Sequence, residues 1–182
     1  MRVPSLQVAF WWRRGGRHIQ CVQEPRRVFV ADLLSSLEFR PRYPGFEAKV
    51  RESFARQQFM ATIHAELVRV APGEVDIEVP RDPSLTQQHG FLHAGVVAAA
   101  VDSACGYAAL TLMSAEAEVL TVELKINLLE PASGQLFLAR GRVLRPGRTL
   151  TVCHGEAVAV NDEAETTVAT LLTTMMAVNA SS

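Results

Sequence analysis

Residues 94–113 read AGVVAAAVDSACGYAALTLM, and this stretch determines the fold that we expect. It is apolar on nearly every face, which is typical of a helix that is buried all round. Its alanines and glycines would let a neighbouring backbone approach closely. A charged residue such as Asp102 in the middle of a membrane-spanning helix costs about 2.5 to 3.5 kcal/mol on insertion scales. The stretch therefore predicts a buried helix rather than a membrane span.

The segments before this helix predict one surface helix and a hairpin. Apolar residues recur at near-helical spacing from Phe46 to Phe59, with charged residues between them, as in an amphipathic helix. Residues 63–70 are extended, and residues 74–79 alternate strictly between acidic and apolar side chains. The break at residues 71–73, Ala-Pro-Gly, makes these two runs a hairpin.

The segments after the helix predict four strands. In residues 119–129, Leu120, Val122, Leu124, Ile126 and Leu128 fall on one face, and Thr121, Glu123, Lys125 and Asn127 fall on the other. Three more extended runs follow, at residues 135–144, 149–160 and 166–178. The whole order predicts an α+β fold in which the long helix packs on an antiparallel sheet.

The N-terminal segment differs in composition from the rest of the chain. Residues 1–44 contain eight arginines, three acidic residues and both tryptophans, whereas the remainder carries a net charge of −6. We expect residues 1–44 to be a basic, poorly ordered extension and residues 45–182 to be one domain. Three origins of the extension stay open: a start codon placed too far upstream, a docking arm, or an organelle-targeting peptide.

Composition narrows the classes of partner and compartment. The formal net charge of −1 gives no reason to expect nucleic acid or a membrane as a partner. The three cysteines, Cys21, Cys105 and Cys153, are widely spaced and form no C-x-x-C pair. A disulfide framework is therefore not expected, and we expect a reducing, cytoplasmic location.

Polar side chains gather just before the buried helix and at one point inside it. The run QQHGFLHAG occupies residues 87–95, and Asp102 follows within the helix. A lone carboxylate on an apolar helix is costly unless it is paired or functional. Desolvation should raise its pKa above the reference of about 3.9 and make it a better base. The alternative is a structural aspartate that binds neighbouring backbone.

The start of the helix offers a second functional element. The first N–H groups, at His93, Ala94 and Gly95, should point out of the helix with the positive end of its dipole. They could stabilise a carbonyl oxygen that develops negative charge. The alternative is an ordinary helix start with a packing glycine. His89 and His93 are spaced for a metal, but no third ligand is near, so we expect no metal site.

These residues carry a resemblance to a known family. Residues 87–102, together with the run LTVELKINLLEPA at residues 120–132, resemble the PaaI-type (phenylacetate-pathway type) acyl-CoA thioesterases of the hotdog superfamily. The resemblance covers about residues 46–178. It implies a hotdog fold, in which a curved antiparallel sheet wraps a long helix. It also implies subunits that pair into a continuous sheet, with active sites at their interface.

The resemblance also implies roles for particular residues. Asp102 corresponds to the family's carboxylate, which acts as base or nucleophile, and Gln87 to the amide side chain near the thioester. His93 corresponds to the histidine before the helix, and Thr121 to a hydroxyl that orients water or the carboxylate. Ala94 would supply the oxyanion N–H, where the family usually has glycine.

The expected function is hydrolysis of acyl-CoA thioesters by a homodimer or homotetramer without a cofactor. Its alternatives are a non-catalytic acyl-CoA binding module and a hotdog dehydratase or hydratase. The acyl-chain length stays open. Arginine binds phosphates well, so a cluster of four arginines could bind those of CoA, although solvated strand and turn arginines are the alternative. The cluster is Arg140, Arg142, Arg145 and Arg148.

Overall fold

The computed structural model describes residues 38–162 and 164–179. Most of the predicted N-terminal extension, residues 1–37, lies outside the described residues. The side chain of Phe39, which is described, packs against the hydrophobic core and contacts Gly73. Within the described ranges, no helix combines the length and the hydropathy needed to cross a membrane.

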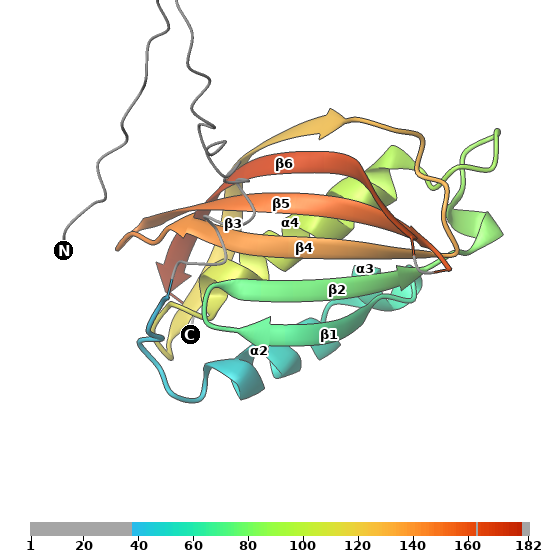
Figure 1. The fold of residues 1–182 in the computed structure, drawn as a ribbon. Coiled ribbons are helices and arrows are strands. Elements are labelled where there is room, and N and C mark those ends of the chain that lie inside the picture. The colour runs from blue at the N-terminus through green and yellow to red at the C-terminus, as the bar shows by residue number, and fades with distance from the viewer. Residues whose placement is uncertain (1–37, 163, 180–182) are drawn as a thin grey trace, which may run out of the picture.

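A single six-stranded antiparallel sheet forms the body of the fold, in the order β1-β2-β4-β5-β6-β3 (Figure 1). The predicted α+β architecture, with a long helix on an antiparallel sheet, is confirmed, and it is a hotdog fold. The third strand does not pair with the fourth; it crosses to the far edge and pairs with β6. The strands are β1 (Glu66–Ala71), β2 (Glu74–Pro80), β3 (Ala117–Leu128), β4 (Leu136–Arg145), β5 (Leu150–Asn161) and β6 (Ala164–Asn179).

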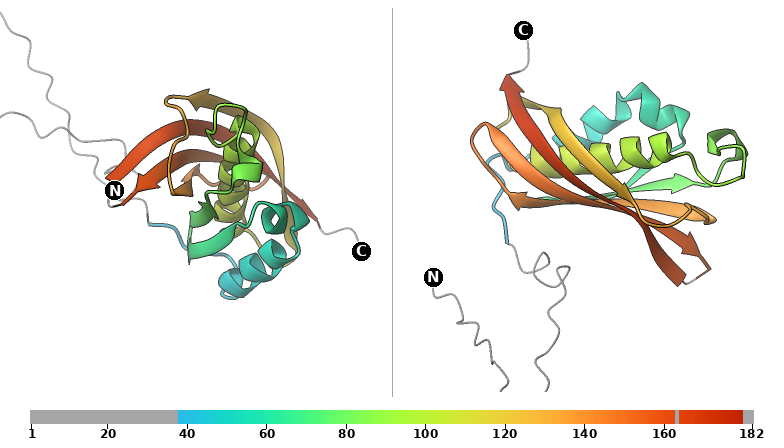
Figure 2. Two further views of the ribbon diagram at one scale, coloured as in Figure 1. Left: turned by 90° about the vertical axis from the view of Figure 1, so that its right-hand side faces the viewer. Right: turned by 90° about the horizontal axis from the view of Figure 1, so that it is seen from above.

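The long helix α4 (Ala94–Leu110) lies across the concave face of the sheet, which curves around it (Figure 2). Two glycines on the inner face of the sheet allow this close approach. A Cβ on Gly141 would lie 2.3 Å from the backbone carbon of Ala104, and one on Gly155 would lie 2.3 Å from a methyl group of Val101. The helix backbone therefore packs where β4 and β5 have no side chain.

One side of α4 remains open, which corrects the prediction that the helix is buried all round. The sheet covers only part of its circumference, and the uncovered residues are small or polar. Those with partial or full exposure are Ala94, Gly95, Ala98, Ala99, Asp102 and Ser103.

Among the described residues, two short helices precede the sheet where one was predicted. α2 (Phe46–Ala55) ends before Gln57, whose backbone is extended, and α3 (Gln58–Thr62) then begins. The predicted hairpin of β1 and β2 is confirmed, and Gly73 takes the positive φ of +79° that its turn requires. The N–H of Gly73 donates to the hydroxyl of Thr111, 2.7 Å away, which ties this turn to the end of α4.

A β-bulge in β3 corrects the predicted alternation of its side chains. Thr121 pairs with Met175 and Glu123 pairs with Thr174, so Val122 is an extra residue. Odd-numbered side chains before the bulge and even-numbered side chains after it therefore lie on the same face of the sheet. Thr121 points inward with Met175, which is fully buried, instead of sharing the outer face with Glu123.

Candidate active site

A short loop places Gln87 beside the start of α4. Thr86 and Leu92 form an isolated antiparallel bridge, and the N–H of Gln87 donates to the carbonyl of Phe91 over 2.9 Å. Gly90 permits this tight loop with a φ of +81°. The N–H of Leu92 donates to the carbonyl of Ala132 over 3.0 Å. The loop is therefore fixed to the segment that follows β3.

At the helix start, only one of the three expected N–H groups remains available. The N–H of His93 donates to the carbonyl of Leu85 over 2.9 Å. His93 caps the helix, and its Nδ1 accepts the N–H of Gly95 over 2.9 Å. Among the described residues, the N–H of Ala94 has no partner. The expectation of three free donors is thus wrong for His93 and Gly95, because the capping geometry uses both.

The cap also fixes the state of the His93 ring when it is neutral. Because Nδ1 accepts a hydrogen bond, the proton of a neutral ring must be on Nε2. His93 is exposed, so this second nitrogen can donate to a ligand at the helix start.

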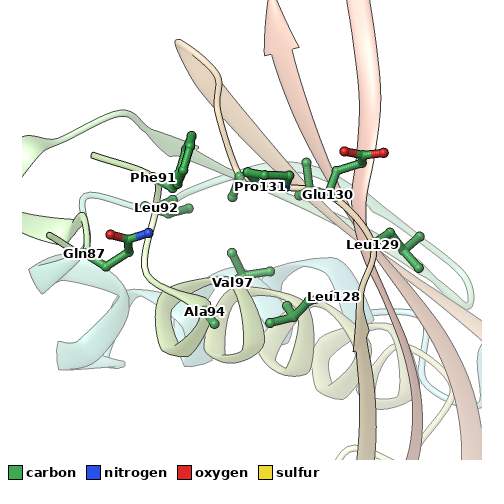
Figure 3. A pocket seen from close by; sticks show the side chains of 11 residues that line it. Gln87, Phe91, Leu92, Ala94, Val97, Leu128, Leu129, Glu130 and Pro131 are labelled. Carbon is green, nitrogen blue, oxygen red and sulfur yellow. The ribbon is translucent and has the colours of Figure 1, made fainter. Parts of the chain in front are cut away.

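A mostly apolar cavity of about 430 Å³ opens at this end of α4 (Figure 3). The side-chain carbonyl of Gln87 accepts the N–H of His89, which leaves the amide nitrogen free to donate. In Figure 3 this nitrogen is the amide atom nearer to the cavity. The lining residues include Gln87, Phe91, Ala94, Val97, Leu128 and Leu129. The cavity thus offers two unused N–H donors within an apolar wall.

The carboxylate of Asp102 lies farther along α4 and is half-buried. The hydroxyl of Thr121 lies 2.9 Å from one carboxylate oxygen and 3.1 Å from the other, so it can donate to either. Burial raises the pKa of the Asp102 carboxyl above its ordinary value, and the hydrogen bond from Thr121 partly offsets that rise. The bulge in β3 positions this contact, because it turns Thr121 inward.

Asp102 opens into a second cavity, of about 150 Å³, rather than into the one at the helix start. Asp102 follows Ala94 by eight residues, a separation of about 12 Å along a helix axis. The predicted site residues therefore form two groups in one chain. Gln87, His93 and Ala94 lie at the start of the helix, and Asp102 and Thr121 lie at its middle.

Comparisons with known proteins identify the family. The thioesterase superfamily model matches residues 89–166. A thioesterase family protein from Silicibacter pomeroyi is 53% identical, with a TM-score of 0.73 over 75% of this chain and 100% of that one. A "putative esterase" of Saccharolobus solfataricus is 36% identical over 108 residues, which are 59% of this chain and 76% of that one. The chain belongs to the thioesterase superfamily.

The thioesterase also resembles the PaaI protein of the Escherichia coli phenylacetic acid degradation operon. The TM-score is 0.67 over 75% of this chain and 95% of that one, at 15% identity. At this identity the likeness extends to the fold alone. The finer PaaI-type assignment therefore stays a prediction within the superfamily.

Two of the four arginines of the thioesterase that were predicted to bind phosphate already have acidic partners. Arg140 forms an ion pair with Glu165 at 2.7 Å, and Arg142 forms one with Asp76. Arg145 and Arg148 are exposed, and Arg148 lines a cavity of about 150 Å³ together with Arg42. The structure thus favours the second pair over the first as phosphate ligands.

The described cysteines of this thioesterase are poor nucleophiles. Cys105 and Cys153 are free and buried. Burial raises the pKa of Cys105 to about 12, and it raises the pKa of Cys153 as well. Both thiols stay protonated near neutral pH, so neither supplies a thiolate. In the parts of the chain that the structure describes, no three metal-binding side chains cluster.

A group of polar residues that the sequence pattern did not predict shares the second cavity of the thioesterase with Asp102. They come from α2, from the break after it and from α4, and they include Ser53, Gln57, Ser103 and Tyr107. The only sequence signal was the proximity of Ser103 to Asp102. Gln57 and Ser53 could not be assigned, because nothing in the pattern placed α2 beside α4.

Proposed function

We propose that this chain hydrolyses acyl-CoA thioesters to a free acid and CoA. One observation carries the proposal: Ala94, whose N–H has no partner among the described residues, lines an apolar cavity at a helix start, and a half-buried carboxylate with a raised pKa lies on the same helix. The first group suits an oxyanion, and the second suits a base or a nucleophile. Thioester hydrolysis needs both.

In the proposed reaction, the thioester carbonyl lies against the N–H of Ala94. Asp102 accepts a proton from water while the water oxygen attacks the carbonyl carbon, or its own oxygen attacks to form an anhydride. The N–H of Ala94 and the amide of Gln87 donate to the oxygen as it gains charge. The intermediate then collapses and expels the CoA thiolate, which takes up the proton released by water. In the anhydride route, water then hydrolyses the anhydride, which releases the free acid and regenerates the Asp102 carboxylate. Thr121 holds the carboxylate, and His93 positions the thioester through Nε2.

Two subunits would complete one site in this proposal. β3 is an edge strand whose apolar side chains are exposed, including Leu120 at 55% and Leu128 at 58%. Pairing it with its copy about a two-fold axis sets the end of one strand against the start of the other. Leu128, at the end of β3, lines the helix-start cavity, whereas Val119, near its start, lines the Asp102 cavity. The pairing therefore brings Ala94 of one copy toward Asp102 of the next.

This arrangement supports a homodimer, alone or as half of a tetramer, with two shared sites. Arg145 and Arg148 are the proposed ligands of the CoA phosphates. No cofactor enters the proposed chemistry, since CoA is the leaving group. We keep the cytoplasm as the proposed location, which the free thiols of Cys105 and Cys153 support.

A small acyl-CoA panel tests the proposal. The purified protein is incubated with short, medium and aromatic acyl-CoAs, and the released thiol is measured with a chromogenic disulfide. We expect thiol release from at least one member of the panel. Saturable binding without thiol release would instead indicate a binding module. Hydration or dehydration of an enoyl-CoA or hydroxyacyl-CoA without thiol release would indicate the other hotdog chemistry.

A further inference from the structure

We propose that Arg42 and Arg148 of one subunit hold a phosphate group of the CoA whose thioester lies at the helix start of the other subunit. The inference rests on the proposed function and adds a basis for selecting the substrate. Acyl groups on CoA are hydrolysed in preference to the same acyl groups on pantetheine, which carries no phosphate. It also adds Arg42, from the stretch expected to be an extension, to the arginines already proposed as phosphate ligands.

The arginine cavity, of about 150 Å³, lies past the end of α4, opposite the helix start (Figure 1). Its lining includes Arg42 and Arg148, with Ser114 and Asn179 as further polar residues and no acidic residue. No ion pair of the described residues includes either arginine. Two positive charges that line one cavity repel each other, and an anion bound between them relieves that repulsion.

Local structure holds both arginines at this cavity. Arg42 lies on a short segment that is anchored on either side. Before it, the ring of Phe39 packs against the hydrophobic core; after it, the N–H of Phe46 donates to the carbonyl of Tyr43 over 3.2 Å, where α2 begins. Arg148 is on the turn that joins β4 to β5. Two separate parts of the chain thus bring their cations to one cavity.

The loop between α4 and β3 forms another wall of the arginine cavity, and Lys49 holds this loop in place. The ammonium group of Lys49 donates to the carbonyls of Ser114 and Ala117. Glu116 and Glu118 interact electrostatically with that ammonium group, and neither lines the arginine cavity. The positive charge of the two arginines is therefore not neutralised by an acidic side chain in the cavity wall.

The phosphates of a bound acyl-CoA need such a site, because the two other cavities offer no cation. Neither the helix-start cavity nor the cavity beside Asp102 is lined by lysine or arginine. The first includes Glu130, and the second includes Asp102 and Glu118. A phosphate in either would meet acidic side chains without a compensating cation, which is unfavourable. Arginine instead binds phosphate through charge-assisted hydrogen bonds.

Pairing of β3 with its copy places the arginine cavity beside the site that needs it. Ala117, the first residue of β3, lines the arginine cavity, and Leu128, the last, lines the helix-start cavity. The register around the bulge puts both side chains on the inner face of the sheet. In the proposed two-fold pair, the start of one strand lies against the end of the other. The arginine cavity of one subunit therefore adjoins the helix-start cavity of the other.

The size of the arginine cavity suits one compact anion. A cavity of about 150 Å³ accommodates a ring the size of benzene. It therefore has room for a phosphate group but not for a whole nucleotide, so the adenosine would stay outside it.

The test compares one acyl group on two carriers, CoA and pantetheine, with thiol release as the measurement. We expect kcat/KM to be at least about tenfold higher for the CoA ester, the effect of one or two charge-assisted hydrogen bonds. The difference should lie mainly in KM, because the arginines contact the phosphate equally before and during the reaction. Added salt should reduce it, because both arginines are exposed and their charges are screened.

Two single variants assign the preference to the arginine cavity. Arg42→Gln and Arg148→Gln should each lower the CoA-to-pantetheine ratio of kcat/KM by roughly 2- to 10-fold, and neither should change the rate on the pantetheine ester. Arg40→Gln is the matched control, since Arg40 is exposed, lies two residues before Arg42 and does not line the cavity. It should leave the ratio unchanged. Melting temperatures identify any variant that does not fold, and the ratio for the unaltered protein still tests the inference.

Mixed dimers show which subunit supplies the arginines. A dimer of one Gln87→Ala chain and one Asp102→Ala chain has a single working site, built from the helix start of the second chain and the carboxylate of the first. Adding Arg42→Gln and Arg148→Gln to the Gln87→Ala chain should lower the CoA preference of that site. Adding them to the Asp102→Ala chain should leave the preference unchanged.

The outcomes separate this inference from the proposed function. Equal kcat/KM for the two carriers, or a preference that neither folded arginine variant lowers, would overturn the phosphate site while leaving hydrolysis in place. Mixed dimers that stay inactive, or that lose the preference only when the arginine substitutions are on the Asp102→Ala chain, would overturn the assignment of the arginines to the other subunit. Failure to hydrolyse any acyl-CoA would overturn the proposed function, and the phosphate site with it.

Discussion

At the scale of single residues, Asp102 is held between two opposing effects. Its burial on α4, beside β3, favours the protonated acid, whereas the hydrogen bond from Thr121 favours the carboxylate. The result is a carboxyl group that ionises at a higher pH than usual but still has a fixed orientation. Both properties suit a base that must accept a proton from water near neutral pH.

Replacing Asp102 with asparagine should keep the fold and remove most turnover. Asparagine preserves the volume but cannot accept a proton, and general-base catalysis contributes roughly 10²- to 10⁴-fold. Thiol release measures kcat. Folding raises the pKa of the Asp102 carboxyl, so at pH 7, above its unfolded pKa, the ionised carboxyl makes the fold less stable. Asparagine removes that charge, so the melting temperature of the variant at pH 7 should be no lower than that of the wild type. A loss of kcat below about tenfold would contradict the assignment.

Replacing Thr121 with valine should move the acidic limb of the pH profile to higher pH. Activity requires ionised Asp102, so kcat/KM falls as the pH drops through its pKa. Thr121 lowers that pKa, and its removal lets the effect of burial act unopposed. Thr170→Val is the control, because Thr170 is on β6, pairs with Asn127 and Glu156 in the sheet and, within the described residues, makes no hydrogen bond to Asp102. A limb that stays in place, or moves to lower pH, would show that Thr121 does not act on Asp102.

At the residue scale, some features of the candidate site could be predicted from the sequence and others could not. The isolation of Asp102 on an apolar helix was visible in the sequence, and the family resemblance pointed to Thr121. The availability of the Ala94 N–H was not visible, because it depends on the partners of its neighbours. The N–H of Gly95 donates to Nδ1 of His93, and the N–H of His93 donates to the carbonyl of Leu85. Such pairings follow from loop geometry, which periodicity does not encode.

At the scale of elements, each strand and the long helix could be located from alternation and apolarity, to within a few residues. Two features could not. The helix predicted from Phe46 to Phe59 breaks at Gln57, and the alternation of β3 changes parity at Val122. In both cases the local sequence pattern predicted a regular helix or strand through the residue at which the structure is irregular. The bulge matters most, since without it Thr121 would face away from Asp102.

The close packing of α4 on β4 at Gly141 should contribute strongly to the stability of the fold. A methyl group there would lie 2.3 Å from the backbone of Ala104, so Gly141→Ala must push α4 away from β4. We expect a loss of about 1 to 3 kcal/mol in the free energy of unfolding, measured by urea titration.

Gly106→Ala is its matched control. A methyl group there would lie 3.9 Å from the nearest atom, on Val119, and alanine favours a helix by about 1 kcal/mol over glycine. Its stability should rise or stay the same. Equal effects from the two substitutions would show that close packing of α4 on β4 does not limit stability.

At the scale of the whole molecule, one chain presents two incomplete half-sites and an apolar edge strand. The donors at the start of α4 and the carboxylate at its middle open into different cavities. The open side of the helix, which includes Gly95 and Asp102, lies between them. From the sequence, the shared site was expected both from the family resemblance and from the separation of His93 and Asp102, which are nine residues or about 13 Å apart along a helix. The structure adds a geometric reason, because β3 reaches one cavity at each of its ends.

Mixing two inactive variants tests whether two chains build each site. Gln87→Ala damages the helix-start half, and Asp102→Ala damages the carboxylate half. When the two chains are unfolded together and refolded, about half of the dimers are mixed. A mixed dimer would hold one intact site beside one doubly damaged site, so the mixture should recover about a quarter of the wild-type thiol release.

The control mixes Asp102→Ala with Asp102→Asn. Both substitutions damage the same half, so every site in every dimer lacks a carboxylate, and no activity should return. Native mass spectrometry measures the mixed fraction in each preparation. If mixed dimers of the first pair form in the expected proportion and remain inactive, each site must draw Gln87 and Asp102 from one chain. The two cavities would then have to join within one subunit, and catalysis would not require subunits to pair through β3. Recovery in proportion to the mixed fraction, and only for the first pair, requires that the start of α4 in one subunit act on a thioester held by Asp102 of the other.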